Sequence, residues 1–133
     1  MNDPKDLIVI IEDDLDDQDI MQVTIQDLCL DCEVVFFDNA DHAFAYLSKP
    51  DIKPFMILSD INIPGINGLQ LKEAIDAIPE LKRKCQPYLF LTTSHKQDPD
   101  RDDIFIKPDS MKGWMNLFTS LIDYWKTTRK PDQ

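Results

Sequence analysis

Residues 7–14, LIVIIEDD, join five apolar residues to three consecutive acids, Glu12, Asp13 and Asp14. The apolar part is short, β-branched and without polar alternation, which is typical of a strand that is buried on both faces of a sheet. Neighbouring carboxylates repel one another, so the stretch raises the question of which positive group holds them together.

The rest of the chain alternates between similar apolar runs and segments with the apolar spacing of helices. Strands without polar alternation that are separated by helices predict a parallel α/β sheet with helices on both faces. Further strands are expected at 33–37, 55–59, 88–93 and 104–106. Helices are expected at 16–29, between Asn39 and Pro50, from Leu69 to Ile78 before Pro79, and after Ser110, with Asn39 and Ser110 as N-caps.

Residues 94–103, SHKQDPDRDD, interrupt this alternation. They are almost wholly polar, with Pro99 in the middle, and they offer no apolar stripe for a helix to bury. A crossover between parallel strands usually takes a dozen or more residues and includes a helix. This segment therefore predicts a loop, or one helical turn at most.

The length and charge of the chain limit its class. With 133 residues, of which 43 % are hydrophobic, it is expected to form one domain, with a core in about 6–126 and a polar tail at 127–133. A net charge of −11 argues against nucleic acid or anionic lipid as a partner and is compatible with a cation or a basic protein. No apolar run approaches the roughly 20 residues of a membrane span, and no signal peptide is apparent, so a cytoplasmic location is expected.

The three cysteines are Cys29, Cys32 and Cys85. An odd number without a secretion signal predicts reduced thiols that pack as small hydrophobic side chains. Cys29 and Cys32 form a CxxC, but a zinc site would need a second pair of ligands at a suitable spacing.

Polar residues follow the predicted strands at the edge where an open parallel sheet binds ligands. Glu12 and Asp13 follow the first strand, Asp60 the third, Thr92 ends the fourth and Lys107 follows the fifth. Carboxylates this close need a counter-charge, and oxygen ligands favour Mg²⁺. A cation, an ammonium and a hydroxyl together form a clamp for a phosphoryl group, with one carboxylate as nucleophile.

The next acids, Asp14, Asp16 and Asp17, are interpreted differently. Aspartate is favoured in the first turn of a helix, where it meets the positive end of the helix dipole. We assign these three residues to the solvated start of the helix at 16–29.

LIVIIEDD, ILSDINIPGINGLQL, LFLTTS and IFIKP together resemble the receiver domain of two-component response regulators, over about residues 6–126. Within this family, the chain is similar to chemotaxis-type regulators and to the single-domain regulators that partner phytochrome-like and other hybrid kinases. The resemblance implies a flavodoxin-like (βα)5 doubly wound sheet with strand order 2-1-3-4-5, here with the fourth helix shortened or missing. No DNA-binding or catalytic domain is expected to follow.

The resemblance also implies a metal site. Asp13 and Asp60 would ligate Mg²⁺ directly, Glu12 through water, and Asn62 through its backbone carbonyl. The positive group that holds the neighbouring carboxylates together would then be a metal ion.

The same resemblance implies a phosphorylation switch. Asp60 would be the phosphoacceptor, Thr92 the switch hydroxyl and Lys107 the contact to the phosphoryl oxygens. The donor would be a histidine kinase or a phosphotransfer protein, and the modified domain would act on a downstream protein as a signalling module rather than as an enzyme. A homodimer is left open.

Two features depart from the family. The aromatic residue that normally lies three positions before the lysine is Ile104, and Phe105 is expected on the opposite face of the strand. Output or dimerisation is expected to use another face, such as the last helix with Trp114 and Trp125; alternatively, these tryptophans cover the core.

Other functions compete with the switch. A pseudo-receiver would keep the fold as an interaction module without phosphorylation. A phosphatase of the haloacid-dehalogenase type would need an acid two residues after the nucleophile, where this chain has Asn62. A flavodoxin-like flavin site would need a loop rich in Ser, Thr and Gly after the first strand, and this loop is acidic.

Overall fold

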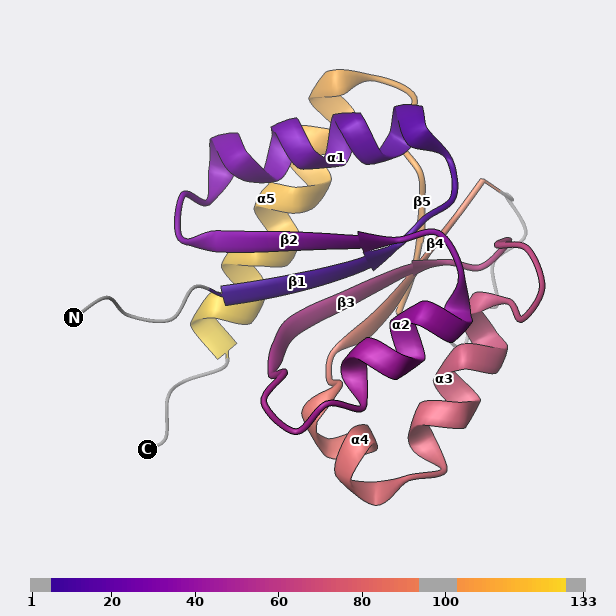
Figure 1. Cartoon of the computed structure of the whole chain (residues 1–133). Helices are drawn as coiled ribbons and strands as arrows, with labels where there is room; N and C mark the ends of the chain where they lie inside the picture. The colour runs from indigo at the N-terminus through magenta and orange to yellow at the C-terminus, as the bar shows by residue number, and fades with distance from the viewer. Residues whose placement is uncertain (1–5, 94–102, 129–133) are drawn as a thin grey trace.

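The computed structural model describes residues 6–93 and 103–128 of the chain (Figure 1). Helices separate the first four strands along the chain and a helix follows the fifth, as the apolar pattern predicts. The strands are β1 (Asp6–Ile11), β2 (Cys32–Phe37), β3 (Pro54–Asp60), β4 (Tyr88–Thr92) and β5 (Ile104–Ile106). The helices are α1 (Leu15–Leu28), α2 (Ala40–Leu47), α3 (Gly68–Asp76), α4 (Pro79–Lys84) and α5 (Met111–Thr128).

The strands form one parallel sheet in the order β2-β1-β3-β4-β5. The predicted flavodoxin-like order is therefore confirmed. In register, Ile11 pairs with Ser59 and Asp60 pairs with Leu91, so the carboxyl ends of the three central strands lie at one edge. Side chains that follow these strands consequently meet at that edge.

Helices cover both faces of the sheet (Figure 1). α1 and α5 pack on one face around Ile8, Ile10 and Phe118, and α2, α3 and α4 pack on the other. Residues alternate between the two clusters along β1, because successive side chains of a strand point to opposite faces. Both sides of β1 are thus apolar, which is why its sequence shows no polar alternation.

The last helix contributes much of one core. Trp114 is only 3 % exposed and stacks on Phe118 with 6.0 Å between ring centroids, and Trp125 is partly buried against the same cluster. The packing role of these tryptophans is therefore confirmed. Among the described residues, no helix combines the length and apolar character of a membrane span.

The predicted helix caps are confirmed. The Asn39 side chain accepts a hydrogen bond from the backbone N–H of His42, and the Ser110 hydroxyl accepts one from the N–H of Gly113. Both satisfy N–H groups that the first helical turn leaves without intrahelical partners.

The helix predicted from Leu69 to Ile78 is shorter than expected. α3 ends at Asp76, and Pro79 begins the separate helix α4, which sequence reasoning missed. Proline lacks a backbone N–H, so it suits the first position of a helix as well as it stops one. The predicted loop at 94–103, and with it the shortened or missing helix between β4 and β5, lies outside the described residues except for Asp103.

The prediction of reduced thiols is wrong for two cysteines. Cys29 and Cys32 form a disulfide between the end of α1 and the start of β2. The N–H of Cys32 donates to the carbonyl of Cys29, and this tight turn brings their Cα atoms to 5.4 Å, within the range that a disulfide spans. Cys85 is free and buried, as predicted.

Candidate functional site

The carboxyl edge of the sheet brings together side chains from distant parts of the sequence. Glu12 follows β1, Asp60 ends β3, and Lys107 follows β5. Backbone hydrogen bonds extend the ladder past the strand ends, with the N–H of Glu12 donating to Phe37 and that of Lys107 donating to Thr92. The three side chains are almost buried, with exposures of 1 %, 9 % and 8 %.

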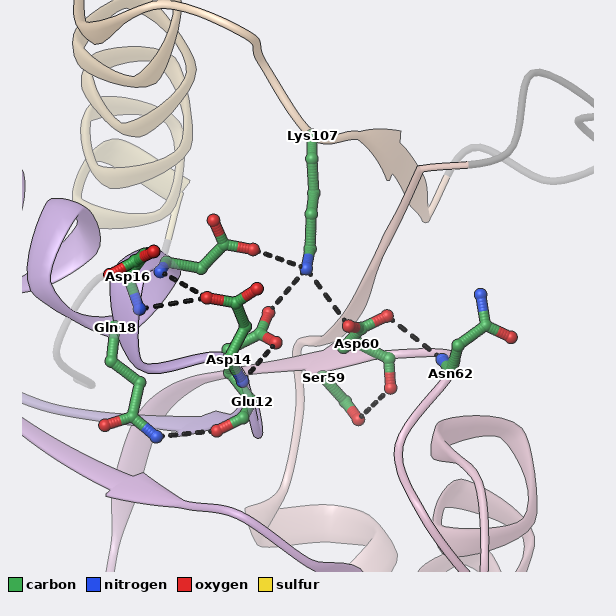
Figure 2. A network of polar contacts seen from close by, with 9 residues as sticks. Glu12, Asp14, Asp16, Gln18, Ser59, Asp60, Asn62 and Lys107 are labelled. Atoms are coloured by element: carbon green, nitrogen blue, oxygen red, sulfur yellow. Dashed lines mark hydrogen bonds and ion pairs between the residues drawn. The ribbon is translucent and has the colours of Figure 1, made fainter.

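The ammonium of Lys107 is the centre of the cluster (Figure 2). Its Nζ donates hydrogen bonds to Oδ2 of Asp17 at 2.8 Å and to Oδ2 of Asp60 at 3.0 Å. It also forms an ion pair with Oε1 of Glu12 at 2.7 Å. One ammonium therefore contacts three carboxylates from separate segments and offsets part of their negative charge, so the protein itself supplies part of the counter-charge of the acidic edge.

Backbone N–H groups hold the two buried carboxylates from the other side (Figure 2). Oδ1 of Asp60 accepts from the N–H of Asn62 at 3.0 Å, and Oε2 of Glu12 accepts from the N–H of Asp14 at 3.1 Å. The side-chain amide of Gln18 donates to the carbonyl of Glu12 at 2.6 Å. These contacts fix the direction of each carboxylate within the cluster.

The start of α3 packs directly on the end of β3. A Cβ atom at Gly68 would lie 2.6 Å from the carbonyl oxygen of Asp60 and 2.7 Å from Oγ of Ser59. The Ser59 hydroxyl donates to that same carbonyl at 3.0 Å. Only glycine fits here, and the backbone of Asp60 is consequently held between its own strand and the next helix.

Burial and charge shift two pKa values in the cluster. Burial raises the pKa of Glu12 to about 7, a rise that nearby Asp60 increases and that Lys107 and the N–H of Asp14 only partly oppose. Burial by itself lowers the pKa of Lys107, but its contacts with Asp17, Glu12 and Asp60 outweigh burial and raise it. The ammonium is thus firmly charged, while Glu12 can take up a proton near neutral pH.

Three of the acids have the arrangement of a cation site. Glu12, Asp13 and Asp60 each offer a carboxylate oxygen, and these oxygens lie within 4.8 Å of one another. Oε1 of Glu12 is buried, and its one partner among the described residues is the ammonium of Lys107, with which it forms the ion pair at 2.7 Å. A carboxylate oxygen has two lone pairs, so this buried oxygen, beside two more carboxylates, can still bind a hard divalent cation.

The remaining predicted site residues lie around this cluster. Thr92 is buried at the end of β4, paired in register with Ile106, and its carbonyl accepts from the N–H of Lys107. Asn62 lies two residues beyond Asp60 and orients its carboxylate. The roles of the Thr92 hydroxyl and of the Asn62 carbonyl stay predictions.

The expected change around β5 is confirmed. Ile104 packs with the cluster under α2, α3 and α4, whereas Phe105 packs with the cluster under α1 and α5. The aromatic ring therefore lies on the other face of the sheet from the position that an aromatic residue normally takes in the family.

Asp17 is the contact that sequence reasoning missed. Asp14 and Asp16 are exposed at the start of α1, as predicted, and Asp14 is its N-cap, since its Oδ1 accepts from the N–H groups of Asp16 and Asp17. Asp17 instead reaches Lys107, with only 24 % of its side chain exposed. The available signal was its place in the first turn, since helical side chains lean toward the N-terminus and hence toward the strand end.

The family of response regulator receiver domains matches residues 8–107 of the chain. This chain belongs to that family. The match runs from within β1 to Lys107, so it includes most of β1, the other four strands and the whole acidic edge. As a receiver domain, the chain is a signalling module of the two-component type.

The receiver domain has relatives of nearly the same extent. The response regulator Rcp1 of Synechocystis sp. is 30 % identical over 100 residues, which cover 71 % of this chain and 67 % of Rcp1. The structure of the phosphorylated cyanobacterial phytochrome response regulator RcpA is similar with a TM-score of 0.82 at 23 % identity, over 96 % of this chain and 99 % of that chain. The Mn²⁺-bound form of Rcp1 has a TM-score of 0.78 at 24 % identity, with the same coverages. These two structures show the shared fold.

Proposed function

We propose that this receiver domain is phosphorylated on Asp60 by a histidine kinase or a phosphotransfer protein, with Mg²⁺ bound, and that the modification switches binding to a downstream protein. The observation that carries the proposal is the 3.0 Å contact between Nζ of Lys107 and Oδ2 of Asp60, next to the group of Glu12, Asp13 and Asp60. A nucleophilic carboxylate, a fixed cation and a cation site are the parts that phosphoryl transfer needs.

The transfer is a displacement at phosphorus. A carboxylate oxygen of Asp60 forms a bond to phosphorus while the P–N bond of the donor phosphohistidine breaks, and the imidazole leaves with the electron pair. The N–H of Asn62 holds Oδ1 of Asp60, which leaves Oδ2, the oxygen next to Lys107, as the attacking atom. The ammonium then neutralises charge on the phosphoryl oxygens, and the Thr92 hydroxyl contacts the modified group.

The cation site would be formed by Asp13 and Asp60 directly, by Glu12 through water and by the carbonyl of Asn62. Bound Mg²⁺ would supply positive charge next to the phosphoryl oxygens during the transfer. The all-oxygen donor set supports a hard cation, and the near-complete burial of the Glu12 and Asp60 side chains would strengthen its attraction to them. The Mn²⁺-bound form of Rcp1 supports a divalent ion as the ligand of this fold.

The receiver unit in this proposal is about 6–126, and it acts by contact with proteins rather than by turnover of a substrate. The phosphorylated state of RcpA supports a modified form with the same fold. The net charge of −11 supports basic protein surfaces as partners.

Acetyl phosphate tests the proposal without a known kinase. We expect intact mass to show one added phosphoryl group with Mg²⁺, none with EDTA and none in Asp60→Asn. Asp38→Asn is the matched control, because Asp38 is an exposed acid at the end of β2, outside the cluster, and this variant should be labelled like the wild type.

A negative result would favour the pseudo-receiver. If the wild type takes no phosphoryl group and binds no beryllofluoride in the presence of Mg²⁺, the domain is an unphosphorylated interaction module.

A further inference from the structure

Lys107 is shared between two kinds of carboxylate. Glu12 and Asp60 belong to the three acids whose oxygens converge for a cation, whereas Asp17 does not. Among the described residues, Asp17 is therefore the one ion-pair partner of Lys107 that a bound cation leaves in place.

A divalent cation would change this balance. It would draw the oxygens of Glu12 and Asp60 toward itself and repel the ammonium, since both are positive. The lysine would then be attracted outward, to solvent, unless another acid holds it. Asp17 is placed to do this, with its Oδ2 at 2.8 Å from Nζ.

We propose that Asp17 is a positioning residue that keeps Lys107 beside the phosphoacceptor when a divalent cation occupies the carboxylates of Glu12 and Asp60. The inference rests on the proposed function, and it assigns to the first turn of α1 a role in the readiness of the site for phosphorylation.

The local structure gives Asp17 a fixed position. Its backbone N–H donates to Oδ1 of Asp14, the N-cap of α1, at 3.2 Å. The next side chain, Gln18, donates to the backbone of Glu12. These hydrogen bonds fix the first turn of α1 beside the end of β1. The Asp17 carboxylate is therefore already in position, and little conformational entropy is lost in ordering it when the cation binds.

The side-chain ammonium of Lys107 can be followed by NMR in lysine-labelled protein, with Mg²⁺ alone as the probe. An ammonium that carboxylates shield from water exchanges its protons slowly enough to give a ¹H–¹⁵N signal. We expect the wild type to keep the Lys107 signal with and without Mg²⁺. Asp17→Asn should keep it in EDTA, where Glu12 and Asp60 still hold the ammonium, and lose it when Mg²⁺ is added.

Asp16→Asn is the matched control, because it removes the same charge from the same helical turn at an exposed position. It should behave as the wild type does. An Asp17→Asn variant that keeps the Lys107 signal in saturating Mg²⁺ would overturn the inference.

Labelling by acetyl phosphate gives a second readout. Loss of one charge-assisted hydrogen bond should slow labelling of Asp17→Asn by about tenfold at saturating Mg²⁺, with the Kd for Mg²⁺ within about twofold of that of the wild type. An unchanged labelling rate with a weakened Mg²⁺ affinity would contradict a positioning role. If the wild type is not labelled at all, the proposed function fails instead, and the NMR result still decides where Lys107 lies.

Discussion

Gly68 approaches Asp60 so closely that a Cβ atom on the glycine would lie 2.6 Å from the carbonyl oxygen of the aspartate. This oxygen belongs to the backbone of β3, so it cannot turn away as the end of a flexible side chain can. The nucleophile proposed here is therefore positioned by the fit of α3 on β3 as much as by its hydrogen bonds.

We expect Gly68→Ala to lower the free energy of unfolding by about 1–3 kcal/mol and to slow labelling of Asp60, because the helix must move away from the strand. Denaturant unfolding and intact mass measure the two effects. Gly65→Ala is the control: a Cβ there meets nothing within 4 Å, and its positive φ of 77° should cost about 1–2 kcal/mol of strain without moving Asp60. Equal stability of Gly68→Ala and the wild type would refute the close fit.

Lys107→Met should destabilise the metal-free protein. The change leaves Glu12, Asp17 and Asp60 without their cation, and breaking a buried ion pair from one side costs about 3–5 kcal/mol. Mg²⁺ should restore part of the loss, and thus stabilise this variant more than it stabilises the wild type. Thermal unfolding in EDTA and in Mg²⁺ measures the difference.

Lys126→Met is the control for this change. Lys126 lies 3.9 Å from Asp6 in an exposed ion pair, and such pairs contribute about 0–1 kcal/mol. If both variants lose equally little thermal stability in EDTA, Lys107 is not the counter-charge of the cluster.

The raised pKa of Glu12 predicts an unusual pH dependence for the stability of the metal-free protein. Its pKa in the folded state is about 7, above the ordinary value of 4.5, so the native state binds more protons than the unfolded state between these values. Stability from this group is therefore fully present below pH 4.5 and is lost as the pH rises through 7, by on the order of 3 kcal/mol in total.

Urea unfolding in EDTA from pH 5 to pH 8 measures this trend. Glu12→Gln cannot titrate at this position. The free energy of unfolding of the wild type minus that of the variant therefore isolates the contribution of Glu12. A difference that does not change with pH would show that Glu12 is already ionised at pH 5.

Cys85 should be unreactive in the native protein. Its thiol is 2 % exposed, and burial raises its pKa to about 11, so at pH 8 about one molecule in a thousand carries the reactive thiolate. A colorimetric thiol assay should detect no thiol in the native protein and one after denaturation without reductant. Three thiols in that second sample would mean that the disulfide between Cys29 and Cys32 is not formed.

The fold was predictable because its signals are local and redundant. Five apolar runs, two N-caps and the acids at the strand ends all point to one parallel sheet, and the sheet order follows from the family resemblance. α4 was not predictable in the same way, because Pro79 is compatible with both the end of one helix and the start of another.

The site was predictable where position along a strand decides it. Glu12, Asp60 and Lys107 meet because parallel strands bring their carboxyl ends to one edge. Asp17 was not predictable from its residue type, because an aspartate in a first helical turn is usually solvated, and 90 residues separate it from its partner. The disulfide was missed for another reason. Reduced thiols were expected because the sequence shows no secretion signal, whereas the short turn between Cys29 and Cys32 brings the two cysteines close enough to bond.

The three contacts of Lys107 also have an evolutionary consequence. A neutral substitution of Glu12 or Asp17 leaves the ammonium with two other acids, so either change keeps Lys107 paired. Loss of the lysine leaves three acids without a protein cation at once, and such a lineage survives only if a metal ion is always available or if the acids are lost as well. We therefore expect a substitution at position 107 to be accompanied by changes among positions 12, 17 and 60.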